Sequence, residues 1–524
     1  MSKNLDVLAI MPHKWNIFPF GLGILLSILK DANFDVDVLD AGNKEMTPIE
    51  TAEQIAVLKP KIIFFGGLLT RFSFIKEVSN LTRDRFPKAT QVAGGWWART
   101  IPTIVFDETS VDYVVRGQPD NFIAEFCQKI IENKSVSDFP GICSRLDDKK
   151  YRIQAPCPSP RKLDELPLPA YELFNMDYYF WTVETKDFRL TPFRSGSWFS
   201  PYFPEHDRYQ KFRNKKTLKW AAMYSGRGCY GLCTFCTAFN MTRRNYAPEY
   251  VVDHMEKMVK EHGVDIFDFT ESLTLSTKIW VKKFCNELIS RNLDCLYVAF
   301  SRGDINYDDE MLDLLSKSGC HAVRIGFESG DDMMLRNMNK KVKVERYRKL
   351  VNKLHEYNML ISASFIFNMP GESQESLDKT VEFIKESKLY DFDYGFATPY
   401  PETPLYDFAM NNGFIKNERD YVLNELGGRR LTTGFFNKKG MDRYVSMFNF
   451  NNLSSQQLLS LKDNLEVLRV INRAYFANRK LYHLLNRMPF LAKIFVFRHF
   501  FRARLVSLIP LPIKTKIKSF LGMR

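Results

Sequence analysis

The sequence of 524 residues predicts an α/β protein with a doubly wound N-terminal domain, a partial (β/α)6 barrel and a helical C-terminal region. Short apolar runs alternate with helix-like segments over 1–140 and again over 221–405, the pattern of parallel sheets covered by helices. Residues 141–220 are expected to form a connector with an aromatic insertion, because prolines interrupt them. The pattern over 406–524 is helical and ends in a basic tail.

Short buried strands are expected in the N-terminal domain. The candidates are Val7–Met11, Val36–Leu39, Ile62–Gly66, Thr90–Ala93 and Tyr113–Val115. Helices are expected between them, for example Gly21–Ala32 and Phe72–Arg85. Glycines follow three of the strands, at Gly66-Gly67, Gly94-Gly95 and Gly117. Because such sheets bind ligands beyond the carboxyl ends of their strands, a ligand site is expected there.

Six further strand–helix units are expected to form the partial barrel. The strands are Ala221–Ser225, Ile266–Thr270, Leu296–Ser301, Ala322–Phe327, Ile361–Phe367 and Tyr394–Thr398. The helices include Ser276–Arg291, Asp308–Ser318, Val344–Tyr357 and Gln374–Lys385. Six units are fewer than the eight of a complete barrel. Beyond them, Ser454 and Ser455 are suitable N-caps for a helix over Gln456–Ala477.

Composition indicates a globular protein of the cytoplasm. The chain is 45% hydrophobic and 14% aromatic, enough to build sizeable cores. Its N-terminus does not resemble a signal peptide, and no apolar run approaches the roughly 18 residues of a spanning helix. Nine cysteines, an odd number without a secretion signal, favour a reducing compartment over a disulfide framework.

The net charge of +13 resides in the C-terminal tail. The last acidic residue is Glu466, and eight arginines and five lysines follow it. A basic segment rich in Phe and Leu is typical of peripheral contact with an anionic membrane. Nucleic acid is a rival partner that the apolar residues disfavour. A helical domain with a basic exterior explains the same pattern without any partner.

Three cysteines form the most specific motif. Cys229, Cys233 and Cys236 lie within eight residues, directly after an expected strand, with the spacing CxxxCxxC. Three thiolates on one loop can hold three irons of a cubane and leave the fourth iron open. Zinc is the alternative, but it commonly uses four closed ligands, and no second cysteine pair is present.

The motif resembles the signature of the radical S-adenosylmethionine (SAM) superfamily, in which an aromatic residue, here Phe235, precedes the last cysteine. The resemblance implies a [4Fe–4S] cluster whose open iron binds SAM. It further implies that one-electron reduction, from a flavodoxin- or ferredoxin-type donor, cleaves SAM to a 5′-deoxyadenosyl radical.

The resemblance continues along the barrel and implies SAM-contacting residues at the strand ends. Glu271 would hold the SAM ammonium, and Ser301 with Arg302 would hold its carboxylate. Glu328 lies in a ribose-contacting "G-x-E-S-G" stretch, and the "P-G-E" turn carries Asn368-Met369 in place of Gly-Leu. Pro399 begins a stretch similar to "P-x-P-G-T-x-L-Y", in which Glu402 replaces glycine.

The N-terminal domain resembles the Rossmann-like cobalamin-binding domain that precedes many radical SAM barrels. The resemblance implies corrinoid contacts at Gly21, Thr70, Arg71, Gly94, Gly95 and Gly117. Glycine at strand ends lets a large ligand approach the backbone. The Asp-x-His-x-x-Gly stretch that supplies a histidine to cobalt is absent, and His13 is the only histidine before residue 206.

Together the two resemblances imply a cobalamin-dependent radical SAM enzyme that methylates an unactivated carbon. In the family scheme one SAM methylates the reduced corrinoid and a second SAM supplies the radical. A cyclase or another bond-forming enzyme acting on a tetrapyrrole or lipid is the alternative, and a non-catalytic carrier is the second. A methylthiotransferase is disfavoured, since no cysteine precedes Cys127. The aromatic insertion and the Phe-rich tail indicate a hydrophobic small-molecule or lipid-like substrate.

Overall fold

The computed structural model describes residues 5–14, 16–147, 150–160, 162–184, 212, 214–427, 448–451, 453–477 and 479–493. The chain divides into two compact units. Unit 1 comprises residues 1–182, 219–300 and 398–432, and unit 2 comprises 183–218, 301–397 and 433–524. Most of the aromatic insertion and residues 494–524 of the basic tail lie outside the described residues.

The N-terminal domain, in unit 1, is built on a seven-stranded sheet with the order β2-β1-β3-β4-β5-β6-β7. Its strands are β1 (Val7–Ile10), β2 (Val36–Leu39), β3 (Ile62–Phe65), β4 (Thr90–Ala93), β5 (Tyr113–Val115), β6 (Ile142–Asp147) and β7 (Lys150–Arg152). The first five strands pair in parallel, and β6 and β7 add antiparallel strands at the edge. The predicted connector therefore begins with two strands that complete this sheet.

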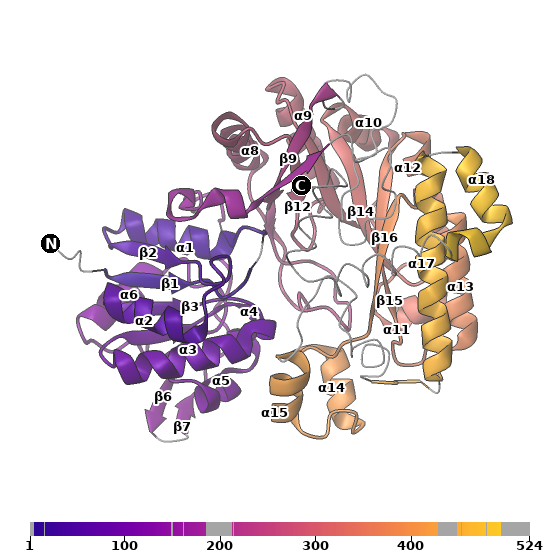
Figure 1. The fold of residues 1–524 in the computed structure, drawn as a ribbon. Helices are drawn as coiled ribbons and strands as arrows, with labels where there is room; N and C mark the ends of the chain where they lie inside the picture. The colour runs from indigo at the N-terminus through magenta and orange to yellow at the C-terminus, as the bar shows by residue number, and fades with distance from the viewer. Residues whose placement is uncertain are drawn as a thin grey trace, which may run out of the picture. The chain divides into compact units, whose positions relative to one another are not determined.

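Helices lie on both faces of this sheet (Figure 1). They are α1 (Phe20–Asp31), α2 (Pro48–Leu58), α3 (Phe72–Arg85), α4 (Gly95–Thr100), α5 (Pro102–Glu108) and α6 (Ile123–Ile131). Helix α1 packs against α6, and α2 packs against α3. The strand order places a topological switch point between β1 and β3, where doubly wound sheets bind their ligands.

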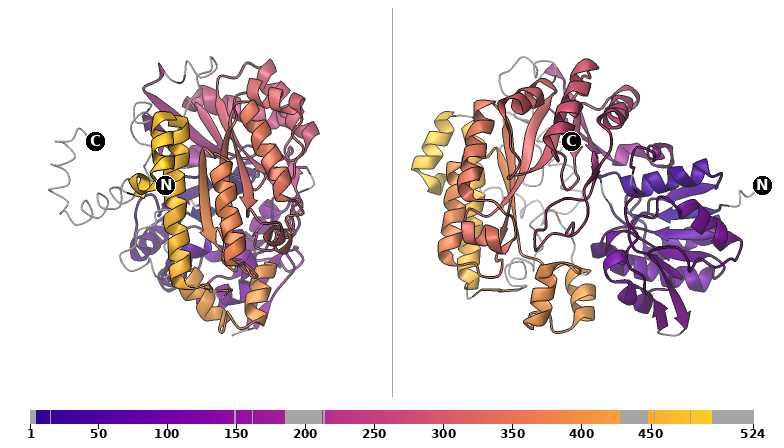
Figure 2. Two further views of the ribbon diagram at one scale, coloured as in Figure 1. Left: turned by 90° about the vertical axis from the view of Figure 1, so that its right-hand side faces the viewer. Right: turned by 180° about the vertical axis from the view of Figure 1, so that it is seen from behind.

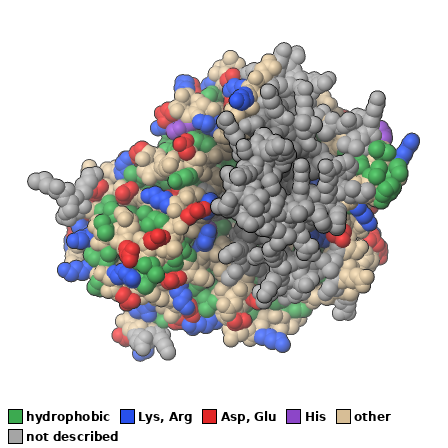
Figure 3. Space-filling view, in the orientation of Figure 1, with side chains coloured by type: hydrophobic (Ala, Val, Ile, Leu, Met, Phe, Trp, Pro, Cys, Tyr) green, Lys and Arg blue, Asp and Glu red, His purple; other side chains and the backbone are tan. Residues whose placement is uncertain are grey.

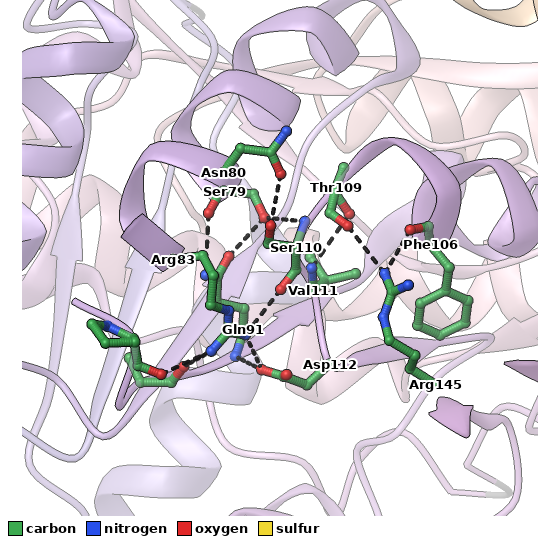
Figure 4. A network of polar contacts seen from close by, with 12 residues as sticks. Ser79, Asn80, Arg83, Gln91, Phe106, Thr109, Ser110, Val111, Asp112 and Arg145 are labelled. Carbon is green, nitrogen blue, oxygen red and sulfur yellow. Dashed lines mark hydrogen bonds and ion pairs between the residues drawn. The ribbon is translucent and has the colours of Figure 1, made fainter. Parts of the chain in front are cut away.

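A polar network fixes α3 to the ends of β4 and β5 (Figure 4). Arg83 donates to the carboxylate of Asp112 at 2.6 Å, and the same carboxylate accepts the backbone N–H of Gln91 at 2.8 Å. The side chain of Gln91, fully buried, accepts from the Ser79 hydroxyl at 2.7 Å. Each buried polar group of this network thus has a partner, which buried groups require.

The second large sheet has the order β16-β15-β14-β13-β12-β9-β8. Its strands are β8 (Phe180–Glu184), β9 (Thr217–Met223), β12 (Ile266–Phe269), β13 (Leu296–Arg302), β14 (Cys320–Glu328), β15 (Leu360–Phe367) and β16 (Asp391–Phe396). The pairs β9–β12, β12–β13, β14–β15 and β15–β16 are parallel. The sequential order of six strands confirms the predicted partial barrel.

Helices follow the barrel strands as the alternation predicts. They are α8 (Pro248–His262), α9 (Lys278–Ser290), α10 (Asp309–Lys317), α11 (Asp332–Asn337), α12 (Val344–Glu356) and α13 (Gln374–Glu386). Thr277 caps α9, and Ser373 forms a capping box at the start of α13. In unit 2, Phe383 of α13 packs against Phe327 and Phe365 of the sheet.

The C-terminal region is helical, as expected. It contains α14 (Pro404–Asn411), α15 (Glu418–Asp420), a π-helical turn (Tyr421–Leu426), α17 (Ser455–Ala477) and α18 (Arg479–Arg487). Figure 2 shows α17 running alongside β16 and α13, which it contacts. Among the described residues no helix is both long enough and apolar enough to cross a membrane.

Two strands begin three or four residues before their predicted start. Strand β9 begins at Thr217 rather than Ala221, and β16 begins at Asp391 rather than Tyr394. Each of these strands begins with polar residues, which the sequence pattern does not distinguish from a loop. In β16, Asp391 is buried because Arg473 of α17 donates to it at 2.9 Å, a partner that lies 82 positions later.

Candidate functional site

The cysteine loop is closed at its base by the short antiparallel pair β10 (Gly226–Arg227) and β11 (Arg244–Asn245). Two glycines permit this closure. A Cβ on Gly226 would lie 2.3 Å from the carbonyl oxygen of Arg244, and one on Gly228 would lie 2.4 Å from that of Thr242. Gly228 also has φ +75°, a left-handed conformation that favours glycine.

Two thiols of the loop accept backbone hydrogen bonds of the kind that cluster thiolates receive. The backbone N–H of Gly231 donates to the Cys229 sulfur at 3.3 Å, and that of Ala238 donates to the Cys236 sulfur at 3.4 Å. Such bonds stabilise thiolates and tune cluster potentials. Cys233 is buried, none of the three forms a disulfide, and Phe235 is half-buried. In the part of the chain that the structure describes, no group of three His, Cys, Asp or Glu side chains is arranged to hold a metal ion.

Glu271 lies beside the start of the cysteine loop, in unit 1. One carboxylate oxygen accepts the backbone N–H of Ser225 at 2.9 Å, and the other accepts from Arg243 at 2.9 Å. Both side chains of the ion pair are buried, 2% and 6% exposed. Burial raises the pKa of Glu271, and the Arg243 guanidinium opposes that rise. The carboxylate is therefore held in a fixed position, while its contact with SAM stays a prediction.

Three other predicted SAM contacts belong to unit 2. Arg302 donates from Nε and Nη2 to the carboxylate of Asp304, the Nη2 contact at 2.8 Å, and Ser301 accepts the hydroxyl of Tyr307. Glu328 has φ +66° and pairs with the buried amine of Lys340 at 3.3 Å. A left-handed glutamate is a strained feature of the kind that clusters at ligand sites. All three residues stay predicted contacts.

The loop after β16 reaches the cysteine loop within unit 1. The backbone N–H of Leu405 donates to the carbonyl oxygen of Thr234, between Cys233 and Phe235, at 2.9 Å. Pro399, another predicted SAM contact, is buried, and its carbonyl oxygen accepts from Tyr421 at 2.7 Å. The stretch 399–405 is therefore held by hydrogen bonds at both of its ends.

The glycines predicted to contact cobalamin separate into two groups. A Cβ on Gly21 or Gly94 would meet nothing within 4 Å, so a large ligand has room at these positions. Gly95 has φ +86° and begins α4. Gly117 differs, because a Cβ there would lie 2.2 Å from the Cys157 carbonyl oxygen. Close packing against Cys157 therefore explains this glycine without a ligand.

The switch-point loops between β1 and β3 carry Thr70, Arg71 and His13. Thr70 is half-buried and Arg71 is exposed, both in the short turn Leu69–Arg71. The Nε2 atom of His13 accepts the backbone N–H of Leu68 at 2.6 Å. Burial, with a smaller effect of Arg71, lowers the pKa of His13 to about 4. His13 is thus neutral, and its Nε2 lone pair joins the two loops instead of being free for cobalt.

A buried ion pair that sequence reasoning missed connects these regions. Arg227, two residues before Cys229, donates two hydrogen bonds of 2.9 Å to the carboxylate of Asp120 and one of 2.9 Å to Gln118. Asp120 is 3% exposed and Arg227 15%. Gln118 and Asp120 follow β5, so the cysteine loop is fixed to the N-terminal domain. Arg227 lies two residues before the predicted motif, but the sequence does not indicate its partner.

Comparison with known proteins agrees with this arrangement. The family model "B12 binding domain" matches residues 14–126, and the model "Radical SAM superfamily" matches residues 223–384. The chain is 22% identical over 410 residues to an uncharacterized methyltransferase of Pyrococcus horikoshii, covering 77% of this chain and 81% of the relative. It is 23% identical over 397 residues to the anaerobic magnesium-protoporphyrin IX monomethyl ester cyclase of Rubrivivax gelatinosus, covering 74% of this chain and 65% of that enzyme.

Solved structures share the fold. The radical SAM methyltransferase TsrM from Kitasatospora setae superimposes with a TM-score of 0.61 at 18% identity, covering 79% of this chain and 77% of that one. The cobalamin-dependent radical enzyme OxsB superimposes with a TM-score of 0.59 at 14% identity, covering 82% of this chain and 57% of OxsB.

The chain therefore combines a B12-binding domain with a radical SAM domain, and the predicted domain pair is confirmed. It is a radical SAM enzyme, and its domains imply a [4Fe–4S] cluster, SAM and cobalamin as cofactors. The N–H groups that donate to the Cys229 and Cys236 sulfurs suit cluster thiolates, and the open positions at Gly21 and Gly94 suit a corrinoid. Enzymes of this superfamily act on small molecules and require a reductant.

Replacing Asp120 by Ala is expected to lower the free energy of unfolding by about 3 kcal/mol, because it leaves the Arg227 charge buried without its partner. Iron bound per chain after anaerobic reconstitution should fall as well, since Arg227 anchors the cysteine loop. Urea unfolding and iron analysis measure the two effects. Asp253→Ala is the matched control, because Asp253 pairs with Arg291 while 62% exposed. Unchanged stability and iron content would contradict the anchoring role of Asp120.

Proposed function

We propose that this protein is a cobalamin-dependent methyltransferase that adds a methyl group to an unactivated carbon of a hydrophobic or natural-product substrate. The ion pair of Arg227 and Asp120 carries the proposal, because it joins the cysteine loop to the B12-binding domain within one compact unit. A relative named as a methyltransferase aligns over 77% of the chain, which supports the same activity. A second such relative, cytidylyl-2-hydroxyethylphosphonate methyltransferase of Streptomyces wedmorensis, aligns over 82% of it.

When bound, the reduced cluster with SAM supplies a carbon-centred radical, and cobalamin supplies the methyl group. Cys229, Cys233 and Cys236 would hold the cluster, with the N–H groups of Gly231 and Ala238 stabilising two of the thiolates. Glu271, fixed by Arg243, offers a carboxylate to the SAM ammonium.

Further SAM contacts are those that the barrel motifs predict. Arg302, with Ser301 beside it, would orient the SAM carboxylate, and Glu328 would accept from a ribose hydroxyl. Pro399 would contact SAM from the loop after β16. On the B12-binding domain, Gly94 and Gly95 would let the corrinoid approach the backbone, with Gly21, Thr70 and Arg71 as further predicted contacts. A one-electron donor of the flavodoxin or ferredoxin type would reduce the cluster.

A cyclase acting on a tetrapyrrole is the second candidate. The relatives include magnesium-protoporphyrin ester cyclases, and one from Cereibacter sphaeroides aligns over 83% of this chain at 24% identity. This function uses the same radical without transferring a methyl group. The two candidates therefore differ in the fate of the SAM methyl.

Product analysis tests the proposal. The protein, reconstituted anaerobically with iron, sulfide and hydroxocobalamin, is incubated with methyl-deuterated SAM, titanium(III) citrate and a small-molecule extract of the source cells. We expect 5′-deoxyadenosine, S-adenosylhomocysteine and a metabolite with a deuterated methyl group, all absent for Cys229→Ala. Cys295→Ala, outside the motif, is the control. Deoxyadenosine without a labelled metabolite would favour the cyclase, and absence of cobalamin binding would contradict methyl transfer.

We further propose that the C-terminal region contacts an anionic membrane. Leu484, Met488 and Phe490 are 46%, 40% and 53% exposed, beside exposed Arg487 and Lys493. Figure 3 shows apolar side chains gathered over α18 next to basic ones, at the right edge of the view. Basic residues near an anionic surface contribute about 1 kcal/mol each. Thirteen basic residues and no acidic residue follow Glu466 in the sequence, and of these Arg469 and Arg473 pair with Asp391.

Vesicle flotation tests the membrane contact. The protein should float with vesicles of phosphatidylcholine and phosphatidylglycerol, and not with phosphatidylcholine alone. Phe490→Ser should reduce flotation severalfold, because the side chain no longer enters the lipid. Ile279→Ser, which replaces a side chain 72% exposed on α9, is the matched control. Equal flotation of both variants, or binding to duplex DNA in place of vesicles, would contradict the proposal.

A further inference from the structure

Glu402 has an unfavourable backbone conformation. It lies in the loop between β16 and α14 with φ +65°, the left-handed region in which a Cβ crowds the following carbonyl. The radical SAM motif that this loop resembles has glycine at the same position, and glycine adopts this conformation at no steric cost. The glutamate side chain must therefore provide something that glycine cannot.

Two arginines of the B12-binding domain contact the Glu402 carboxylate. Arg116 donates from Nη2 to Oε1 at 2.7 Å, and Nε of Arg99 lies 3.3 Å from Oε2. Arg116 is itself held in place, since it donates to the carbonyl oxygens of Arg99 at 2.7 Å and Gln154 at 2.6 Å. Glu402 thus meets a guanidinium whose position is already fixed. All of these residues belong to unit 1.

Helix α4 connects this contact to the predicted corrinoid site. It begins at Gly95, directly after the open position at Gly94, and carries Arg99 in its last turn. Trp96 of the same helix packs edge-to-face on Tyr400, with ring centroids 5.5 Å apart. The loop that carries Glu402 therefore contacts α4 at two residues, Trp96 and Arg99.

We propose that Glu402 is a positioning residue that fixes α4, and with it the Gly94–Gly95 turn, against the loop between β16 and α14. Half-exposed ion pairs contribute little net stability, and here the pairs are set against a strained backbone. The ion pairs therefore change the free energy of folding little, and their effect is to fix the position of α4. The consequence for cobalamin rests on the proposed function, whereas the contact itself does not.

Hydrogen exchange of the protein without cofactors tests the proposal. In Glu402→Gly, the amides of residues 94–101 should exchange roughly threefold to tenfold faster, because α4 loses its ionic contact. The thermal midpoint should change little, since relief of strain offsets the lost pairs. Glu402→Gln keeps the strained backbone and removes the charge, so it should exchange faster too. Unchanged exchange in both variants would overturn the proposal.

Glu45→Gly is the matched control. Glu45 is another left-handed glutamate, with φ +56°, and it pairs with Lys14 at the surface, where it is 68% exposed. The substitution removes the same charge and the same backbone strain without changing the loop between β16 and α14. We expect it to leave exchange over 94–101 unchanged, and an equal increase in this control would also overturn the proposal.

Titration with hydroxocobalamin measures the consequence for the cofactor. Glu402→Gly should weaken binding severalfold relative to the wild-type protein and to Glu45→Gly, because the Gly94–Gly95 turn is no longer held. If the wild-type protein binds no cobalamin, the proposed function fails, while the exchange experiment still decides the role of Glu402. Faster exchange with unchanged cobalamin affinity would overturn the assignment of Glu402 to corrinoid positioning.

Discussion

The buried ion pair between Arg227 and Asp120 is the contact on which the arrangement of the cofactor regions depends. Arg227 lies in β10, two residues before the first cluster cysteine, and Asp120 follows the last parallel strand of the N-terminal sheet. Because the aspartate is almost completely buried, neither charge can be left alone without a large cost. The pair therefore defines how the cysteine loop approaches the B12-binding domain, and the contacts of Glu402 and Tyr400 with α4 add to it at a second place.

The cysteine loop is itself constrained by backbone geometry. Gly226 and Gly228 allow β10 and β11 to approach each other, and no larger residue fits against the facing carbonyls. The resulting loop places N–H groups beside two of its sulfurs. The same backbone geometry therefore determines both the shape of the loop and the hydrogen bonds to these thiols. Glu271 sits beside this loop because the backbone N–H of Ser225 and the guanidinium of Arg243 hold it there. A reactive centre that must exclude competing reactions benefits from such a rigid frame.

Local patterns in the sequence predict most of the elements, and long-range partners explain what they miss. Val36–Leu39 and Thr90–Ala93 are short strand-like segments of the strand–helix alternation, and the structure has strands at those bounds. Strand β16 begins with Asp391-Phe392-Asp393, which does not resemble a buried strand until arginines of α17 neutralise it. The cysteine motif is local and therefore visible, whereas Asp120, Arg243 and the arginines around Glu402 meet their partners only through folding. At Gly117 the sequence pattern is typical of a ligand site, and close packing against Cys157 also requires a glycine there.

Both cofactors must be held at one defined separation if this frame performs methyl transfer. The most direct measurement is the distance between cob(II)alamin and the reduced [4Fe–4S] cluster in the reconstituted protein, obtained by pulsed dipolar electron paramagnetic resonance. The buried pair and the Glu402 contacts predict one narrow distance distribution. A broad distribution, or the absence of dipolar coupling in protein that contains both cofactors, would contradict a fixed arrangement of the two sites.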